Sequence, residues 1–288
     1  GVLLNANSGE VLGMVSLPDF DPAFIKGAAS DAKFNRATLG VYEMGSTFKI
    51  FNTALALDSG SATLKSGYDA TKPIRIARYT INDYHPKKRW LSVPEIFMYS
   101  SNIGSAKMAD EFGALAQKAF MKKLGFFDKL AVELPERASP IFPSFWRRIH
   151  TMTISYGHGI AVSPLHLTSG VATIVNGGIR WPVTILKRSG VHRAVGKQII
   201  SAKTSLDMRR ILRLVVENGT GRKASANGYL VGGKTGTAEK QAAQGGYAKK
   251  LRLSSFVGAF PIHDPKYVVL VMVDEPKGNK SSFGFATV

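Results

Sequence analysis

Ser46 and Lys49 are the first residues in the sequence whose types and spacing could do chemistry. A lysine three residues after a serine on a helix lies on the same helical face, so the Lys49 amine can reach the Ser46 hydroxyl. The two residues would then form a nucleophile and its base. Lysine is almost wholly protonated at neutral pH, so this chemistry requires burial or a neighbouring cation that lowers the pKa of Lys49. Backbone N–H groups at a helix N-terminus could also stabilise an oxyanion beside Ser46.

The segment from Gly45 to Gly60 has the pattern of a buried helix that would position this pair. Apolar residues recur in it at three- and four-residue spacing, no proline interrupts them, and a glycine follows the last of them. The Ser-x-x-Lys pattern alone is common, and its structural alternative is a helix-capping serine beside a solvated lysine. A catalytic interpretation therefore needs further residues.

Two more motifs supply groups that such a site requires. Ser100 and Asn102 lie in a break between helical segments, where short polar side chains favour a turn that can project into a cleft. The other motif, read as a strand edge, offers a fixed cation, hydroxyls for a carboxylate and a glycine that allows close approach of a substrate backbone: Lys234, Thr235, Gly236 and Thr237. Lys234 could be the second cation that Lys49 requires.

The hydrophobic periodicity along the rest of the sequence predicts the helices and strands that must position these residues. Helical periodicity predicts helices at about 46–59, 93–125 with a break at 99–104, 164–176 and 204–217, the last with Leu206, Met208, Ile211, Leu212 and Val215 as its apolar positions. Strand patterns predict a hairpin at 2–15 and strands at 229–231, 254–260 and 267–273. Residues 61–90 are expected to be mainly loop with short strands, and residues 126–150 to be loop-like.

Two local patterns point to other chemistry and are not supported by their context. Gly228 to Thr235 satisfies the phosphate-loop pattern of nucleotide hydrolases, but a polar segment precedes it and Gly236 falls where a helix should begin. His158 is flanked by glycines and could act as a base, but no nucleophile-elbow sequence exists to partner it, and a lone histidine is more often structural.

Composition narrows the class of protein. The 288 residues are 44% hydrophobic and 20% charged, as in an ordinary globular chain of one large or two modest domains. The absence of cysteine excludes a disulfide scaffold and a thiolate nucleophile, and the six histidines have no metal-ligand spacing. No apolar run approaches the length of a membrane span. We expect neither a metal nor a cofactor.

The net charge of +18 could attract polyanions such as nucleic acid. The cations, however, occur in scattered pairs, without a recognition motif or interleaved aromatic residues. A solvated surface, or one that faces an anionic cell envelope, explains the charge equally well. We therefore expect no nucleic-acid partner.

The three motifs, in this order, resemble those of the serine penicillin-binding and β-lactamase superfamily. The resemblance covers essentially the whole chain and is strongest to the transpeptidase domain of class B penicillin-binding proteins, in particular the division-type, monofunctional members. Beyond the three motifs it rests on residues 2–22, Asn35-Arg36-Ala37, 155–159, 218–221, 234–238 and 255–258.

This resemblance implies an α+β fold, with an antiparallel sheet flanked by helices and a mainly helical subdomain. One domain would span 1–288, with an α/β part at 1–45 and about 180–288 and a mainly helical part at about 46–179. The family normally has a helix before the first strand and another after the last, whereas this sequence starts at the hairpin and stops at 285–288. We expect one sheet face to lack its cover unless those helices, like the family's membrane anchor, lie outside this sequence.

The resemblance also implies a D,D-transpeptidase that cross-links peptidoglycan stem peptides on the periplasmic side of the bacterial inner membrane and is acylated by β-lactams. Other proteins of cell-wall synthesis and division would be its partners. Ser46 would attack the penultimate D-Ala carbonyl and Lys49 would take its proton. The other roles would be a proton relay at Ser100, contacts to Lys49 and the substrate amide at Asn102, positive potential at Lys234, carboxylate binding at Thr235 and Thr237, and an oxyanion hole from the N–H groups of Ser46 and Thr237.

Two alternative functions belong to the same superfamily. A serine β-lactamase needs a positioned base for deacylation, and the sequence leaves Glu133 and Glu136 open for that role. The Ser-Ser-Asn form of the middle motif, in place of Ser-Asp-Asn, favours the transpeptidase. A non-catalytic β-lactam sensor is the second rival, and a P-loop NTPase and a nucleic-acid-binding module are remote ones.

Overall fold

The computed structural model describes residues 1–188, 195–241 and 247–277. Its centre is a five-stranded antiparallel sheet with the strand order β2-β1-β11-β10-β9. The strands are β1 (Val2–Asn5), β2 (Val11–Met14), β9 (Gly232–Gln241), β10 (Tyr247–Phe260) and β11 (Tyr267–Asp274). This confirms the α+β fold with an antiparallel sheet. The first hairpin pairs with the last strand, and β9 is left at one edge.

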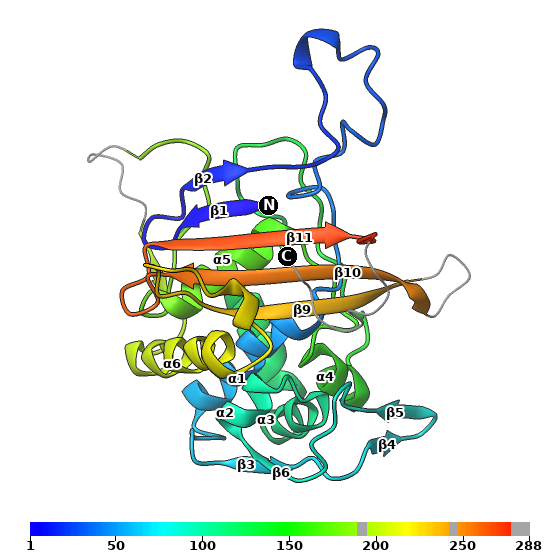
Figure 1. Ribbon diagram of the computed structural model, residues 1–288, viewed down its shortest axis with the longest axis vertical. Helices are drawn as coiled ribbons and strands as arrows, with labels where there is room; N and C mark the ends of the chain where they lie inside the picture. Colours follow the sequence, from blue (N-terminus) through cyan, green and yellow to red (C-terminus); the bar gives the residue numbers. More distant parts are fainter. Residues whose placement is uncertain (189–194, 242–246, 278–288) are drawn as a thin grey trace.

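Helices lie behind and below this sheet in Figure 1. The α-helices are α1 (Lys49–Ser59), α2 (Val93–Met98), α3 (Asn102–Leu124), α4 (Arg148–Ile154), α5 (Pro164–Val175) and α6 (Ala202–Asn218). Short 3-10 turns form η1 (Pro22–Phe24), η2 (Gly45–Phe48) and η3 (Arg222–Ala224). Small two-stranded sheets pair β3 (Gly67–Asp69) with β6 (Trp90–Ser92), β4 (Ile74–Ile76) with β5 (Tyr79–Ile81), and β7 (Ile179–Arg180) with β8 (Lys197–Gln198).

Most of the elements expected from periodicity are present. The break expected at 99–104 is the gap between α2 and α3, and the helix expected at 204–217 is α6. The strand expected from Tyr229 is wrong, because β9 begins at Gly232 and Tyr229 is 62% exposed. Leu206 was expected on the apolar face of α6, but its side chain is 40% exposed. Both errors follow from reading apolar residues without knowing what packs against them.

The expected division of the domain into two parts stays a prediction. Helix α5 falls within the expected helical part, yet it packs directly against β1, β10 and β11 of the sheet. Helix α6 bridges β9 to α1 and α2. The end of the sequence at 285–288, where the cover of the sheet was in question, lies outside the described residues. Among the residues that are described, no helix is both long and apolar enough to cross a membrane.

Helix α1 is held in the core by an aromatic cluster. Phe48, Phe51 and Phe126 are completely buried, and the Phe51 and Phe126 rings meet edge to face with centroids 4.8 Å apart. Gly170 of α5 allows this approach, since a Cβ there would lie 2.6 Å from the Phe126 ring. Helix α1 also packs against α3, α5 and α6. The segment that carries Ser46 and Lys49 is therefore fixed by the interior of the protein.

Replacing Phe126 by alanine should destabilise the protein by about 3–5 kcal/mol, because it removes a fully buried ring and leaves a cavity against α1. Urea denaturation would measure the change. Phe145→Ala is the control: that ring is 69% exposed, so its loss should change the free energy of unfolding by less than about 0.5 kcal/mol. Equal effects of the two substitutions would contradict this account of the core.

Candidate active site

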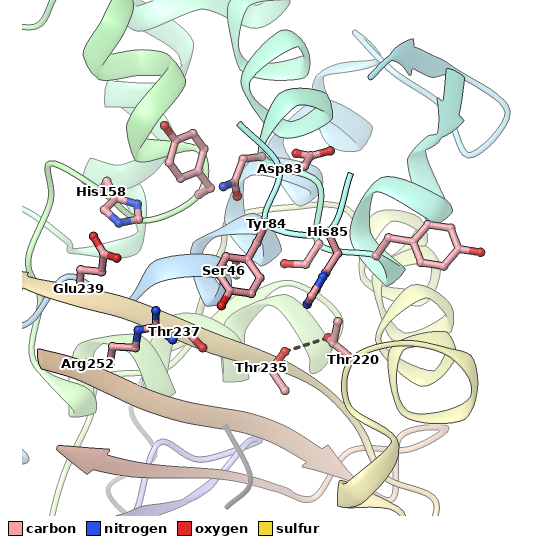
Figure 2. A pocket seen from close by; sticks show the side chains of 14 residues that line it. Ser46, Asp83, Tyr84, His85, His158, Thr220, Thr235, Thr237, Glu239 and Arg252 are labelled. Atoms are coloured by element: carbon pink, nitrogen blue, oxygen red, sulfur yellow. Dashed lines mark hydrogen bonds between the residues drawn. The ribbon is translucent and has the colours of Figure 1, made fainter. Parts of the chain in front are cut away.

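A pocket opens between strand β9 and the helices that lie above it in Figure 2. Five of the residues singled out in the sequence line it: Ser46, Ser100, Asn102, Thr235 and Thr237. Lys49 and Lys234 are completely buried beside them. The sequence reasoning missed several other lining residues, which are Asp83, Tyr84, His85, Tyr99, Tyr156, Thr220, Glu239 and Arg252. His158, which the sequence favours as structural, also lines the pocket.

Ser46 lies in the 3-10 turn η2, directly before α1. The backbone of this turn packs directly against the backbone of β9. Gly45 has a φ of +54°, and a Cβ there would lie 2.4 Å from the Thr237 carbonyl oxygen. Only glycine accommodates both the left-handed backbone and this approach. The close packing places the Ser46 hydroxyl next to the exposed edge of the sheet.

The Lys49 amine is the centre of the hydrogen-bond network. Nζ donates to Ser46 Oγ at 2.7 Å, to Asn102 Oδ1 at 2.7 Å and to Ser100 Oγ at 3.3 Å. Burial lowers the pKa of Lys49 well below its usual value, and the charge of Lys234 lowers it further. Both effects disfavour the protonated amine. The geometry therefore fits a lysine that can accept the Ser46 proton.

Lys234 projects from β9 into the same network. Its Nζ donates to Ser100 Oγ at 3.0 Å and to the Thr235 carbonyl oxygen at 3.1 Å. Burial lowers the pKa of Lys234 to about 7. The Ser100 hydroxyl thus lies between two amines and can pass a proton between them and the pocket. Lys234 is the second cation that the sequence requires near Lys49.

Ser100 and Asn102 come from the turn between α2 and α3. Ser100 has a φ of +61°, a left-handed conformation that is uncommon outside glycine and often found in functional sites. Ser101 caps α3, its hydroxyl accepting from the Gly104 N–H at 3.0 Å. This cap fixes the turn so that the two neighbouring side chains, Ser100 and Asn102, point toward Lys49.

The remaining residues of the Lys234 motif differ in their surroundings. Thr235 and Thr237 line the pocket, and the Thr235 hydroxyl is 2.8 Å from the hydroxyl of Thr220. Gly236 does not line it. A Cβ at Gly236 would lie 2.7 Å from the Met44 carbonyl oxygen and 2.6 Å from Ser255 Oγ. Packing of β9 against the Ser46 turn therefore requires a glycine at this position. The close approach of a substrate backbone to Gly236, which the sequence suggests, stays a prediction.

The sequence matches a known family over nearly its full length. Residues 1–286 fit the profile described as "Penicillin binding protein transpeptidase domain". The chain belongs to this family. The identification agrees with the three ordered motifs and with the site into which they fold.

Several relatives of this transpeptidase domain have names or structures. The chain is 42% identical to the protein of Caulobacter vibrioides named "Probable peptidoglycan D,D-transpeptidase FtsI", over 100% of this chain and 50% of that protein. It is 32% identical to "Probable peptidoglycan D,D-transpeptidase PenA" of Neisseria meningitidis, over 96% of this chain and 47% of that protein. It therefore spans about half the length of these relatives.

Solved structures show the same fold. The transpeptidase domain of Burkholderia pseudomallei penicillin-binding protein 3 is 33% identical and superposes with a TM-score of 0.86, over 96% of this chain and 79% of that one. Penicillin-binding protein 3 of Mycobacterium tuberculosis, in a complex with aztreonam, is 27% identical with a TM-score of 0.88, over 96% of this chain and 66% of that one.

The residues left open for rival functions lie away from the pocket of the transpeptidase domain. Glu133 accepts from the Thr184 hydroxyl at 2.6 Å and from the Ile185 N–H at 3.0 Å. Glu136 accepts from the side chain of Asn35 at 3.4 Å. Neither glutamate lines the pocket. The phosphate-loop pattern is also misplaced, because the strand β9 runs through residues where such a loop would open a helix.

Two lining residues come from a turn that the sequence analysis had already singled out. Tyr156 and His158 belong to the glycine-flanked turn at 155–159, and the Lys49 Nζ lies 5.7 Å from the centre of the Tyr156 ring. Burial, with a smaller effect of Lys49, lowers the pKa of His158 to about 4. His158 is therefore neutral at physiological pH and adds no cation to the site. In the described ranges no three His, Asp or Glu side chains cluster as a metal site would require.

Lys234→Met should raise the pKa of Lys49 above its value in the unaltered protein, because it removes a positive charge that disfavours the protonated amine. Carbon-13 NMR of isotopically labelled lysines, with Lys49→Met to assign the signal, would follow the titration. The control is Lys240→Met on the same strand, whose amine pairs with Asp274 and Glu275 outside the pocket. The account would be contradicted if Lys240→Met shifted the titration of Lys49 as much as Lys234→Met.

Proposed function

We propose that this domain is a serine D,D-transpeptidase that cross-links peptidoglycan stem peptides through an acyl-enzyme and is acylated by β-lactams. The proposal depends above all on the Lys49 amine, which is buried, low in pKa and 2.7 Å from Ser46 Oγ. The names of the relatives support the reaction, and the aztreonam complex of the mycobacterial relative supports β-lactam binding.

In the first step Ser46 Oγ attacks the carbonyl carbon of the penultimate D-Ala. Neutral Lys49 accepts the hydroxyl proton as the Oγ–C bond forms. The negative charge that develops on the carbonyl oxygen is stabilised by the N–H groups of Ser46 and Thr237, which the packing of η2 on β9 brings close together. Because these groups are fixed before the substrate arrives, little reorganisation is needed during the reaction.

In the second step the C–N bond of the scissile peptide breaks and the terminal D-Ala leaves. Its nitrogen needs a proton, and Ser100 can deliver one because its hydroxyl contacts both Lys49 and Lys234. An amine of a second stem peptide then attacks the ester, loses a proton to the same network, and forms the cross-link. Ser46 regains its proton and the site is restored.

The substrate's terminal carboxylate fits the hydroxyl end of the pocket. Thr220 and Thr235 share a hydrogen bond there, Thr237 lies on the same face of β9, and Lys234 is buried behind them. A partly charged lysine and several hydroxyls suit a carboxylate. Strand β9 is also an edge of the sheet, so an extended peptide can pair with it along its backbone.

The cellular setting belongs to the same proposal. We place the domain on the periplasmic side of the bacterial inner membrane, with other cell-wall and division proteins as its partners. The strong positive charge of +18 suits a surface that faces an anionic envelope. No cofactor is required by any step.

Ser46→Ala should abolish covalent labelling by a fluorescent penicillin, because the attacking oxygen is lost. A stable adduct on the unaltered protein, detected by gel fluorescence and located at residue 46 by mass spectrometry, is the expected result. Ser59→Ala is the matched control, since Ser59 is an exposed serine at the far end of α1, the helix that follows the Ser46 turn, and this variant should label normally. Labelling that persists in Ser46→Ala would refute the assignment of the nucleophile.

The lifetime of the penicillin adduct on the same protein distinguishes a transpeptidase from a β-lactamase. Acylation that persists for many minutes supports the transpeptidase, whereas hydrolysis of a chromogenic cephalosporin at many turnovers per second would support the β-lactamase. The carboxylates that line the pocket are Asp83 and Glu239, so these would be the residues to replace in that case. A non-catalytic sensor would be acylated but would not transfer the acyl group to an added amine.

Gly157→Ala should slow acylation by about 100-fold, because a Cβ there would lie 2.1 Å from the Gly45 carbonyl oxygen and would displace the turn that carries Ser46. Gly159→Ala is the matched control. Both glycines have left-handed backbones, with φ of +84° and +87°, but the nearest atom to a Cβ at Gly159 is 3.6 Å away. Stopped-flow measurement of acylation would compare them, and equal rates in the two variants would contradict the packing argument.

A further inference from the structure

We propose that Asp83 is a positioning residue of this active site, whose carboxylate holds the turn at 100–102 in the geometry from which Ser100 and Asn102 reach Lys49. The inference rests on the proposed function, because it concerns the same acylation step. Asp83 belongs to none of the three motifs, and it lies in a segment that the sequence predicts to be mainly loop.

Both oxygens of the Asp83 carboxylate accept hydrogen bonds at the start of α3. Oδ2 accepts from the Ser101 hydroxyl at 2.8 Å, and Oδ1 accepts from the Ile103 N–H at 2.9 Å. The first N–H groups of a helix have no partner within the helix, and here one of them is satisfied from outside it. Ser101 in turn caps the Gly104 N–H, and its side chain is almost completely buried. Asp83 therefore binds the residues on both sides of Asn102, the side chain of Ser101 and the backbone of Ile103.

The residue before Asp83 fixes the Asn102 side chain. The Asn82 carbonyl oxygen accepts from Asn102 Nδ2 at 3.0 Å, which leaves Oδ1 facing the Lys49 amine at 2.7 Å. Two consecutive residues of one loop thus set both the position of the turn and the orientation of the amide. Such support matters because the left-handed backbone of Ser100 is disfavoured for a residue with a side chain.

The loop that carries Asp83 is itself anchored. It follows β5 of the β4–β5 hairpin, and Ile81 at the end of β5 is buried in a small cluster with Ala106 of α3, Met152 of α4 and Tyr156. Asp83 is therefore held on a hairpin that packs against the same helix whose start it binds. Figure 2 shows its side chain above Ser46, at the side of the pocket opposite Thr235.

Asp83 also acts on Lys49 through its charge. The groups that face Lys49 are the cation Lys234 from β9, the ring of Tyr156 and the neutral His158 from the turn at 155–159, and Asp83 from the loop. Glu43 accepts from the Gly159 N–H, and its charge raises the pKa of Tyr156. Burial and Lys234 lower the pKa of Lys49, and Asp83 raises it. Loss of the Asp83 charge should therefore make Lys49 lose its proton at lower pH.

The test is Asp83→Asn in the whole domain, with acylation by a fluorescent penicillin followed by stopped flow. We expect the rate constant of the acylation step to fall by about 10- to 100-fold, while the dissociation constant of the initial complex stays within about twofold, because Asp83 acts on the turn and not on the ligand. The acid limb of the pH–rate profile should move to lower pH. A merely structural role would not move that limb.

Two further variants complete the design. Asp83→Glu keeps the charge but displaces the oxygens, so we expect a reduced rate with the acid limb unmoved. Asp69→Asn is the matched control, because Asp69 is an exposed aspartate that pairs with Lys107 of α3 away from the pocket, and it should behave as the unaltered protein. Circular dichroism and thermal melting establish that each variant is folded.

A folded Asp83→Asn with an unaltered rate and pH profile would overturn the inference. If Asp83→Asn does not fold, Ser101→Ala decides, since it removes one of the two donors that the carboxylate binds. A reduced acylation rate in Ser101→Ala supports the inference, and an unaltered rate overturns it. Failure of the unaltered protein to react with penicillin would instead overturn the proposed function, so the two failures are distinguishable.

Discussion

The active site depends on a lysine amine that is buried and yet fully hydrogen-bonded. Burial without polar partners would be very unfavourable for an amine, and an exposed amine would stay protonated. The Lys49 amine avoids both outcomes, because Ser46, Ser100 and Asn102 surround it while Lys234 disfavours its charge. The Ser46 turn, the turn at 100–102 and strand β9, which supply these groups, must therefore all lie next to Lys49.

Backbone packing makes this meeting possible. A Cβ at Gly45 would collide with Thr237, one at Gly157 with Gly45, and one at Gly236 with Met44. The turn that carries Ser46 is thus enclosed between the sheet edge and a second turn, at distances that only glycine permits. The same packing leaves the edge of β9 open beside the nucleophile, which suits an extended peptide. Rigidity of the nucleophile and access of the substrate arise from one arrangement.

Much of the fold and of the site could be predicted because the relevant signals are local. The buried helix after Ser46 and the break before Asn102 are encoded in periodicity and turn chemistry within a few residues. The predictions failed where the answer depends on a distant neighbour. An apolar run at Tyr229 resembles a strand but is exposed, and nothing near Asp83 in the sequence indicates that α3 begins beside it.

The sequence by itself determined the chemical groups, their order and a helical spacing that allows Lys49 to reach Ser46, since residues three apart lie on one face of a helix. Only the tertiary structure decided that Ser100 and Asn102 meet the Lys49 amine at 3.3 and 2.7 Å, and that Lys234 joins them through a hydrogen bond of 3.0 Å to Ser100. It also decided the direction of the pKa shifts of both lysines and the part that Asp83 has in the site. The physical reason is that burial and charge–charge distances are properties of the packed chain, and residue order does not contain them without the fold.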